Sequence, residues 1–249
     1  MHFKQVLVFD IESEYGHFRK FNTTTSPLTY SVPTRPAIAG FLGAILGYER
    51  ETAAGIFGKG VAPIADIFSK KNACIAVQIM QPTRKATMCF NLLDTAKTAS
   101  SFFNVEQRTQ IDFELLKKPT FRIFIHLADE NRFEELVERV RNNKTHFTPY
   151  LGISQFTSRV IFRGVTAANL SDSAEYQEVV TAVSILKVED IRFNYAADFK
   201  YTSDTMPIEM LPNREVIEYA EVIVETTGKT ISVKSNQIYL TDFGNILFL

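Results

Sequence analysis

The side chains of this chain that could do chemistry gather in one segment near its beginning, between Tyr15 and Tyr48. We select the following cationic, aromatic and imidazole candidates from it: His17, Phe18, Arg19, Lys20, Tyr30 and Arg35. Cations pair with phosphate groups and aromatic rings stack on bases, so this mixture predicts a surface that holds a nucleic-acid backbone. The alternative interpretation is that the basic residues are solvated.

The same segment has side chains that could cleave RNA without a metal ion. Such cleavage needs a base for the ribose 2′-hydroxyl, an acid for the leaving oxygen and a cation for the charge of the phosphorane. His17 and either Tyr15 or Tyr30 have side chains suited to proton transfer, and Arg19 or Lys20 carries the required charge. The sequence does not place these groups together, so binding and cleavage both stay open.

A helix with a row of glycines is predicted directly after these residues. Thr34 is a suitable N-cap, Pro36 suits the first turn, and Gly47 suits the end. Gly40, Gly43 and Gly47 are three and four residues apart, so they lie along one side of the helix. Because glycine has no side chain, we expect Gly40 and Gly43 to let another backbone approach closely. The alternative is that they pack the helix against a sheet.

The hydrophobic pattern predicts the elements that must position this segment. Four stretches have the composition of strands: Gln5–Ser13, Ala73–Met80, Phe121–Leu127 and Arg159–Val165. A second, amphipathic helix is predicted over Asn131–Asn142. The resulting order β-α-β-β-α-β is typical of the ferredoxin-like, or RRM-like, fold, so we predict an α+β domain over residues 1–166.

A long insertion over residues 81–118 separates the two central strands of this predicted domain, where a tight hairpin would suffice. Loops of this length in compact domains are usually functional or disordered. The insertion mixes cations with aromatic rings, as phosphate pairing and base stacking require. Its candidate RNA-contacting residues are Arg84, Lys85, Arg108 and Lys117, and the mixture also includes Lys97, Lys118, Phe90, Phe102 and Phe103. Packing on a partner subunit and a solvated, flexible loop are the alternatives.

The rest of the chain is mostly β-rich, and we predict a smaller C-terminal region over residues 167–249. The expected strands are Glu178–Leu186, Asp190–Phe199, Val216–Thr226, Thr230–Lys234 and Gln237–Thr241. The sequence Thr227-Gly228-Lys229 is predicted to form a hairpin turn between two of them.

The charge of the chain is divided unevenly along its length. Residues 1–164 contain 21 Lys and Arg against 15 Asp and Glu, a net charge of +6. Residues 165–249 contain 6 against 13, a net charge of −7. We therefore expect an anionic partner to meet the first two thirds, and a protein partner or solvent to meet the last third.

Several classes of protein are disfavoured. No apolar run approaches the roughly 20 residues that span a bilayer, and the first residues do not have the pattern of a signal peptide, so we expect a cytoplasmic protein that binds no membrane. Cys74 and Cys89 match no metal or redox spacing and are expected to be reduced, buried thiols. The histidines form no metal-ligand pattern, and the segment 55–60 is too short for a phosphate loop. We therefore expect neither metal nor cofactor.

Two groups of motifs occur in order along the chain. The first comprises the pair Phe18-Arg19, a Thr/Ser-rich turn over residues 23–26, the sequence Tyr30-x-x-Pro33 and the glycines over residues 40–47. The second comprises the segments 91–93, 108–122 and 150–156. The first group resembles the N-terminal signature of the CRISPR-associated "Cas five" family of the RAMP superfamily, and the second group resembles its type I-B branch. The resemblance extends well over residues 3–165 and only loosely over the C-terminal third.

Members of that family have a ferredoxin-like palm with a long thumb inserted between its central strands. The resemblance implies a subunit of Cascade, the RNA-guided surveillance complex of antiviral defence, that binds and caps the 5′ repeat-derived handle of crRNA. It implies a Cas-seven backbone subunit and a Cas-eight large subunit as neighbours. By position, residues 81–118 would form the thumb. Contact with target DNA near its recognition motif stays open.

The type I-C branch differs, because its member is an endonuclease that processes precursor crRNA with a Tyr, a Lys and an adjacent His. This chain offers Tyr48, but Lys117 is followed by Lys118 and not by His. In type I-B systems a separate Cas-six enzyme normally processes the RNA. We therefore expect a non-catalytic RNA-binding subunit. The alternatives are a metal-independent endoribonuclease and an assembly module that binds only proteins.

Overall fold

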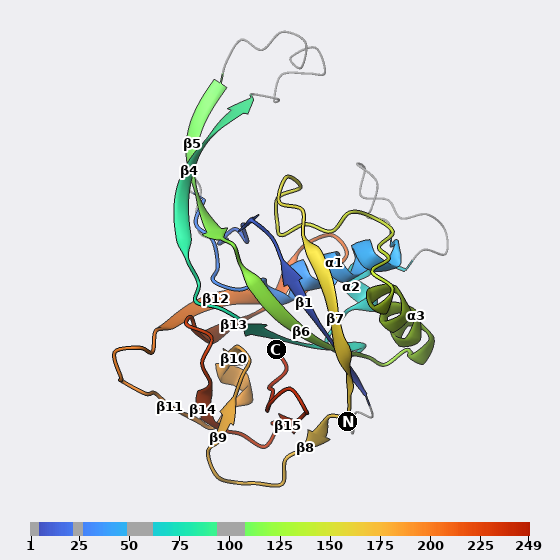
Figure 1. The fold of residues 1–249 in the computed structure, drawn as a ribbon, viewed down its shortest axis with the longest axis vertical. Coiled ribbons are helices and arrows are strands. Elements are labelled where there is room, and N and C mark those ends of the chain that lie inside the picture. The colour runs from blue at the N-terminus through green and yellow to red at the C-terminus, as the bar shows by residue number, and fades with distance from the viewer. Residues whose placement is uncertain (1–4, 22–26, 49–61, 94–107) are drawn as a thin grey trace.

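The computed structural model describes residues 5–21, 27–48, 62–93 and 108–249 (Figure 1). The chain has a mixed α and β structure in which strands predominate. The helices lie together on one side of the body, and a two-stranded ribbon projects from it (Figure 1). No helix of the described part is long and apolar enough to cross a membrane.

A four-stranded sheet forms the centre of the molecule. Its strands lie in the order β3 (Ala73–Ile79), β6 (Thr120–Leu127), β1 (Val6–Glu12) and β7 (Arg159–Thr166), and all neighbours are antiparallel. Because side chains alternate along a strand, alternate residues of β1 contribute to two different apolar clusters. The larger cluster contains Leu7, Phe9 and Ile11, and the smaller one contains Val6 and Val8.

Helices α1 (Arg35–Leu46) and α3 (Glu130–Arg141) pack on the larger apolar cluster of this sheet, together with the short α2 (Ile64–Ile67). The Asp129 side chain caps α3 by accepting a hydrogen bond from the Arg132 N–H at 3.1 Å. The four predicted strands and two predicted helices are all present within one residue of their expected bounds. Their order is therefore confirmed.

The insertion between β3 and β6 is a paired ribbon where we expected a loop. Strands β4 (Lys85–Leu93) and β5 (Arg108–Lys117) pair in antiparallel register from Lys85 opposite Leu116 to Leu93 opposite Arg108. The short β2 (Tyr15–Gly16) pairs with the other edge of β5 and fixes the base of the ribbon to the body. The candidates Lys97, Phe102 and Phe103 lie outside the described residues.

The C-terminal region contains two small sheets and a further strand pair. One sheet has the order β10 (Val183–Ser184), β13 (Val216–Glu225) and β12 (Tyr201–Met210), and the other has the order β11 (Asp190–Arg192), β14 (Ile231–Lys234) and β9 (Gln177–Val179). Strands β8 (Asn169–Leu170) and β15 (Tyr239–Leu240) pair with each other, and a 3-10 turn, η2 (Ile185–Lys187), follows β10. The expected strand Glu178–Leu186 is thus broken into short pieces.

The prediction of a hairpin at Thr227–Lys229 was wrong. Strand β13 pairs with β12 and β10, whereas β14 pairs with β11 and β9, so the turn links two different sheets. The buried Glu225 carboxylate organises this turn by accepting the Thr227 N–H at 3.0 Å and the Lys229 N–H at 2.7 Å. Gly228 supplies the positive φ of 90° that the reversal requires.

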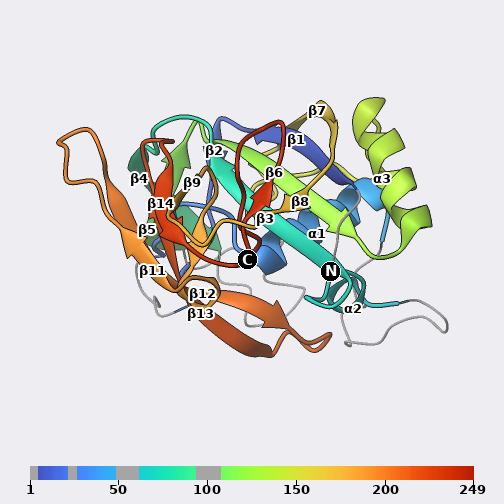
Figure 2. The ribbon, with the colours of Figure 1, turned by 90° about the horizontal axis from the view of Figure 1, so that it is seen from below.

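The C-terminal region and the central sheet share one hydrophobic core. Met206 and Val222 of the β12–β13 hairpin belong to the same buried cluster as Ile38 of α1. The chain end also contacts the edge of the central sheet, because the Leu249 N–H donates to the Ile75 carbonyl of β3 at 2.9 Å. Figure 2 shows this end of the chain beside β3. The last third therefore helps to build the surroundings of α1.

Candidate nucleic-acid interface

A cleft of about 1370 Å³ runs beside α1 and is lined by segments that are far apart in the sequence. They are residues 17–19, the first half of α1, part of α2, Phe113 of the ribbon, the loop 147–153 and the tip of the β12–β13 hairpin. Small-molecule pockets usually measure roughly 300–1,000 Å³. The volume of this cleft lies above that range.

Helix α1 forms one wall of the cleft, and its ends are formed as the sequence predicts. The Thr34 hydroxyl accepts the Ala37 N–H at 3.4 Å, and Gly47 ends the helix with φ +85°. Gly40 is exposed, and a Cβ placed on it would meet no other atom within 4 Å. A Cβ placed on Gly43 would lie 2.9 Å from Cδ1 of Ile64 in α2. Gly40 thus opens onto the cleft, whereas Gly43 packs one helix of the chain on another.

His17 lies at the junction of the cleft and the ribbon. Its Nδ1–H donates to the Glu114 carbonyl of β5 at 2.8 Å, and its ring meets Phe113 edge-on. Burial lowers the pKa of this imidazole, so the ring is neutral at pH 7. Its Nε2 is then the nitrogen with the lone pair, and it is buried without a hydrogen-bond partner. His17 therefore lines the cleft as a hydrogen-bond acceptor and not as a cation.

Three of the candidate RNA-contacting side chains lie in the core, which corrects their expected roles. Phe18 is 6% exposed and packs edge-on against Phe121. Tyr30 is 2% exposed, and its hydroxyl donates to the Thr205 carbonyl at 2.8 Å. Arg35 is 3% exposed, and its Nη2 donates to the Ala73 carbonyl at 2.8 Å. Phe18 and Arg35 also border the cleft, as the equally buried His17 does, but little of any of these side chains is exposed to a ligand.

The other two cations of the first segment remain near the surface. Arg19 is exposed and lines the cleft. Lys20 is half-buried, forms an ion pair with Asp204 of β12, and has its Nζ 5.7 Å from the ring centre of Tyr30. Its charge is therefore partly neutralised within the chain, and Arg19 is the more exposed of the two cations.

The candidates of the insertion separate into two groups. Arg84, Lys85 and Lys117 lie at the base of the ribbon, where the Lys117 N–H donates to the Arg84 carbonyl at 2.8 Å. Lys85 contacts Glu114, with Nζ 3.1 Å from Oε2. Arg108 is eight residues from Leu116 along β5, so it lies about 26 Å away at roughly 3.3 Å per residue. The ribbon therefore cannot present all four cations to one short site.

One face of the ribbon is apolar, which was not predicted from the sequence. Met88 lies opposite Phe113, and Phe90 lies opposite Ile111, so their side chains share a face. The rings of Phe90 and Phe113 are 5.0 Å apart. The alternation of apolar and polar residues in the sequence over residues 86–92 is the signal that could have predicted it. Because Phe113 also lines the cleft, this face continues into it.

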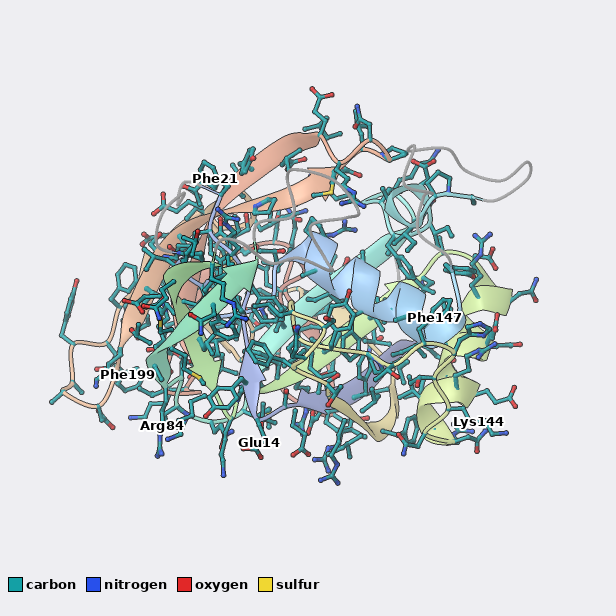
Figure 3. The ribbon with its side chains drawn as sticks, turned by 90° about the horizontal axis from the view of Figure 1, so that it is seen from above. Glu14, Phe21, Arg84, Lys144, Phe147 and Phe199 are labelled. Carbon is teal, nitrogen blue, oxygen red and sulfur yellow. The ribbon has the colours of Figure 1, made fainter. Side chains whose placement is uncertain are left out.

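The loop 147–153 completes the cleft, and its role was not predicted beyond the resemblance of its motif. Phe147 and Tyr150 line the cleft and are 42% and 39% exposed. Phe147 lies beside the end of α1 (Figure 3), where its N–H donates to the Ala44 carbonyl at 2.9 Å. A Cβ on Gly152 would lie 1.7 Å from the His17 carbonyl oxygen, and φ at Gly152 is +85°. Only glycine at this position allows the loop to lie this close to His17.

The other groups considered for acid–base chemistry each contact a different part of the chain. Burial raises the pKa of Tyr30, whose hydroxyl is bound to Thr205. Tyr48 packs against Phe68, and Tyr15 packs against Phe156. Lys118 lies 3.9 Å from a carboxylate oxygen of Glu14. His17 is thus the acid–base candidate with an unpartnered nitrogen, and that Nε2 is buried in the wall of the cleft.

The cysteines differ from one another. Cys74 is half-buried in β3, as the sequence suggested, but Cys89 is exposed on the ribbon, so the expectation that both are buried was wrong. Within the described ranges, no group of three or more His, Cys, Asp or Glu residues could hold a metal ion.

Two solved structures are similar to the fold described above. One is a chain of a "CRISPR RNA-guided surveillance complex", with a TM-score of 0.51 and 10% identity over 97% of this chain and 90% of that chain. The other is a chain of "Type III-B Cmr-beta bound to cognate target RNA and AMPPnP", with a TM-score of 0.50 and 12% identity over 92% of this chain and 86% of that chain. At these identities the likeness concerns the fold alone.

The family comparison is more specific. A search of the curated proteins found no match. The model of the family described as CRISPR-associated protein (Cas_Cas5) matches residues 6–225. This match covers most of the chain and includes α1, the ribbon and the β12–β13 hairpin. The chain therefore belongs to the CRISPR-associated Cas5 family.

Proposed function

We propose that this protein is a non-catalytic subunit of a type I CRISPR effector complex, of the I-B kind, that holds the 5′ handle of crRNA in the α1 cleft. The observation that carries the proposal is Gly40, which opens onto a large cleft with Arg19 and the exposed rings of Phe147 and Tyr150 in its lining. A phosphate backbone could approach α1 at Gly40, and an unstacked base could pack on an exposed ring.

The fold supports this proposal in a general way. The strand order β3-β6-β1-β7, with helices α1 and α3 as crossovers, is the arrangement expected of a ferredoxin-like palm over residues 1–166. The β4–β5 ribbon would be its thumb, and residues 167–249 would form the C-terminal region. One similar structure is from a CRISPR RNA-guided surveillance complex, and the other is from a Type III-B Cmr-beta bound to cognate target RNA. The proposed neighbours are a backbone subunit and a large subunit of the same complex.

The residues proposed to contact the handle are those that the cleft and the base of the ribbon leave available. Arg19, Arg84 and Lys117 are exposed cations that could meet phosphates. His17 would accept a hydrogen bond from a base or a ribose. Lys85 and Arg108 are retained as ribbon contacts outside the cleft. Phe18, Tyr30 and Arg35 act instead as core residues that shape the cleft wall.

The test is one gel on which the purified protein and labelled repeat RNA are incubated in EDTA and read for both mobility shift and cleavage. A shift without cutting is expected, and Arg19→Ala should weaken it, because a phosphate contact is lost. Absence of a shift at low salt would contradict the proposal.

A metal-independent endoribonuclease is the second candidate, and one observation favours it. The Nε2 of His17 has no hydrogen-bond partner and is buried in the wall of the cleft, so its lone pair could serve as a general base if an RNA ribose reached it. Cutting of the RNA in EDTA that His17→Ala abolishes would establish this function. It would also overturn the non-catalytic assignment.

A further inference from the structure

The outer face of the β12–β13 hairpin exposes apolar side chains where a soluble surface would normally be polar. Alternate residues of β13 point to opposite sides: Ala220 and Val222 are buried in the core, whereas Ile217 and Tyr219 are exposed. Ile217 is 53% exposed and Tyr219 is 41% exposed. Neither side chain is needed for the core of the chain, so the apolar character of these two exposed positions needs another explanation.

A third apolar side chain joins them from a distant part of the chain. Phe21 is 60% exposed, and the centre of its ring lies 5.1 Å from that of Tyr219. Figure 3 shows Phe21 beside the orange β12–β13 hairpin. We call Phe21, Tyr219 and Ile217 the docking strip. Contiguous exposed apolar groups of this kind mark interaction sites, whereas single ones do not.

Carboxylates bracket the docking strip. Glu221 follows Tyr219 on the same exposed face of β13, and Glu215 is exposed directly before the strand begins, near Ile217. They belong to the region of residues 165–249, whose net charge is −7. Phosphates would be repelled by this surface, so RNA is a poor occupant. A protein with apolar side chains between Lys or Arg residues is the complementary one.

The edge of the hairpin is closed to a partner that would add a strand. Strand β12 is the outer strand of its sheet, and Pro207 within it has no N–H to donate. Side chains of the chain itself cap two of its carbonyls: Tyr30 donates to Thr205 at 2.8 Å, and Arg35 donates to Ile208 at 3.5 Å. A partner must therefore bind the face and use side-chain contacts.

We propose that the docking strip, with Glu215 and Glu221, binds another protein subunit of the effector complex through an apolar contact flanked by basic residues. The proposal rests on the proposed function only for the identity of that partner as a subunit of the same complex. It assigns protein binding to the strip and RNA binding to the α1 cleft, as separate surfaces of one chain.

The test measures binding of the purified backbone and large subunits to the full chain, without RNA and then with it. The main variant is Ile217→Lys combined with Tyr219→Lys, and Tyr219→Ser is the milder version that keeps the hairpin if the double variant unfolds. Tyr195→Lys is the matched control, because Tyr195 is 91% exposed on the β11–β12 loop. A thermal melt of each variant checks the fold.

The strip variants should weaken binding of one subunit by about tenfold or more, because aromatic anchors dominate interfaces. Tyr195→Lys should leave it unchanged, and all variants should bind handle RNA as the wild type does. The double variant Glu215→Lys with Glu221→Lys should weaken binding of the same subunit and reduce the salt dependence of that binding.

Unchanged binding of both subunits by the folded strip variants would overturn the proposal. Weakened RNA binding with intact subunit binding would overturn it as well, because the strip would then serve RNA. Loss of subunit binding in a protein that never binds RNA would leave this inference standing while the proposed function fails.

Discussion

The α1 cleft and the docking strip are two surfaces that share one hairpin but are built in opposite ways. The tip of β12–β13 lines the cleft, where polar atoms such as Nε2 of His17 are buried and apolar walls surround an open glycine. The outer face of the same hairpin exposes apolar rings between carboxylates. The comparison indicates that two faces of one hairpin can suit different partners, because the side chains exposed on each face differ in charge and polarity.

The largest expected effect concerns the wall of the cleft. Gly152→Ala should destabilise the protein by about 4 kcal/mol or more, because the new Cβ would lie 1.7 Å from the His17 carbonyl oxygen at a φ of +85°. Chemical denaturation measures the loss, with Gly40→Ala as the control. A wild-type unfolding midpoint for Gly152→Ala would show that the loop 147–153 is not locked to His17.

Two arginines of the first segment should behave differently. Arg35→Ala is expected to cost about 2–4 kcal/mol of unfolding free energy, because it leaves the carbonyls of Ala73 and Ile208 without a donor and opens a cavity. Arg19→Ala should change stability by less than about 0.5 kcal/mol, as exposed substitutions usually do, yet weaken RNA binding. Equal stability of the two variants would contradict the burial of Arg35.

The glycine that opens onto the cleft offers a sharper comparison. Gly40→Glu should weaken the binding of handle RNA by about tenfold or more, because it places a carboxylate where a phosphate is proposed to lie. Gly40→Gln separates charge from size, since the two side chains have nearly the same shape. Both should raise helix stability by roughly 0.5–1 kcal/mol relative to glycine. If neither variant weakened RNA binding, the RNA would have to bind elsewhere. Subunit binding at the docking strip is the control, and neither variant should change it.

The smallest expected effect is a dependence of stability on pH. Burial lowers the pKa of His17 below 6.5 in the folded chain, so the unfolded chain binds a proton that the folded ring does not. Unfolding free energy should therefore fall as pH drops through 6.5 toward the lowered value. His17→Gln should reduce this loss, measured by denaturation at pH 7 and pH 5, and the half-buried His126, whose pKa is also lowered by burial, accounts for a further part. An unchanged loss in the variant would show that His17 titrates normally.

Local signals in the sequence were enough to predict the elements around the central sheet. Thr34, Pro36 and Gly47 define α1 through interactions within a few residues of it, and the apolar strands follow from their alternation. Strand β12 was not predicted, because Asp204, Pro207 and Glu209 interrupt its β-rich composition. It is held by pairing with β13, an interaction that no short window contains.

The candidate site was harder to predict than the fold. The charges of Arg19 and Arg35 are alike in sequence, but Arg35 begins a helix whose first turn packs under β12, and only the tertiary structure shows this. Gly40 and Gly43 differ for the same reason, because Ile64 of α2 covers one of them. The loop 147–153 and the docking strip depend on contacts between segments that are distant in the sequence, and local composition does not predict such contacts.

Cross-linking of a photoreactive handle RNA to the wild-type protein, followed by mass spectrometry of the joined peptides, tests the central claim most directly. The account predicts that cross-links fall on the lining of the α1 cleft, at Phe147, Tyr150 or the peptide containing Arg19, and that the peptide of residues 215–221 carries none. Cross-links concentrated on Ile217 and Tyr219, with the cleft unmarked, would contradict the assignment of the two surfaces.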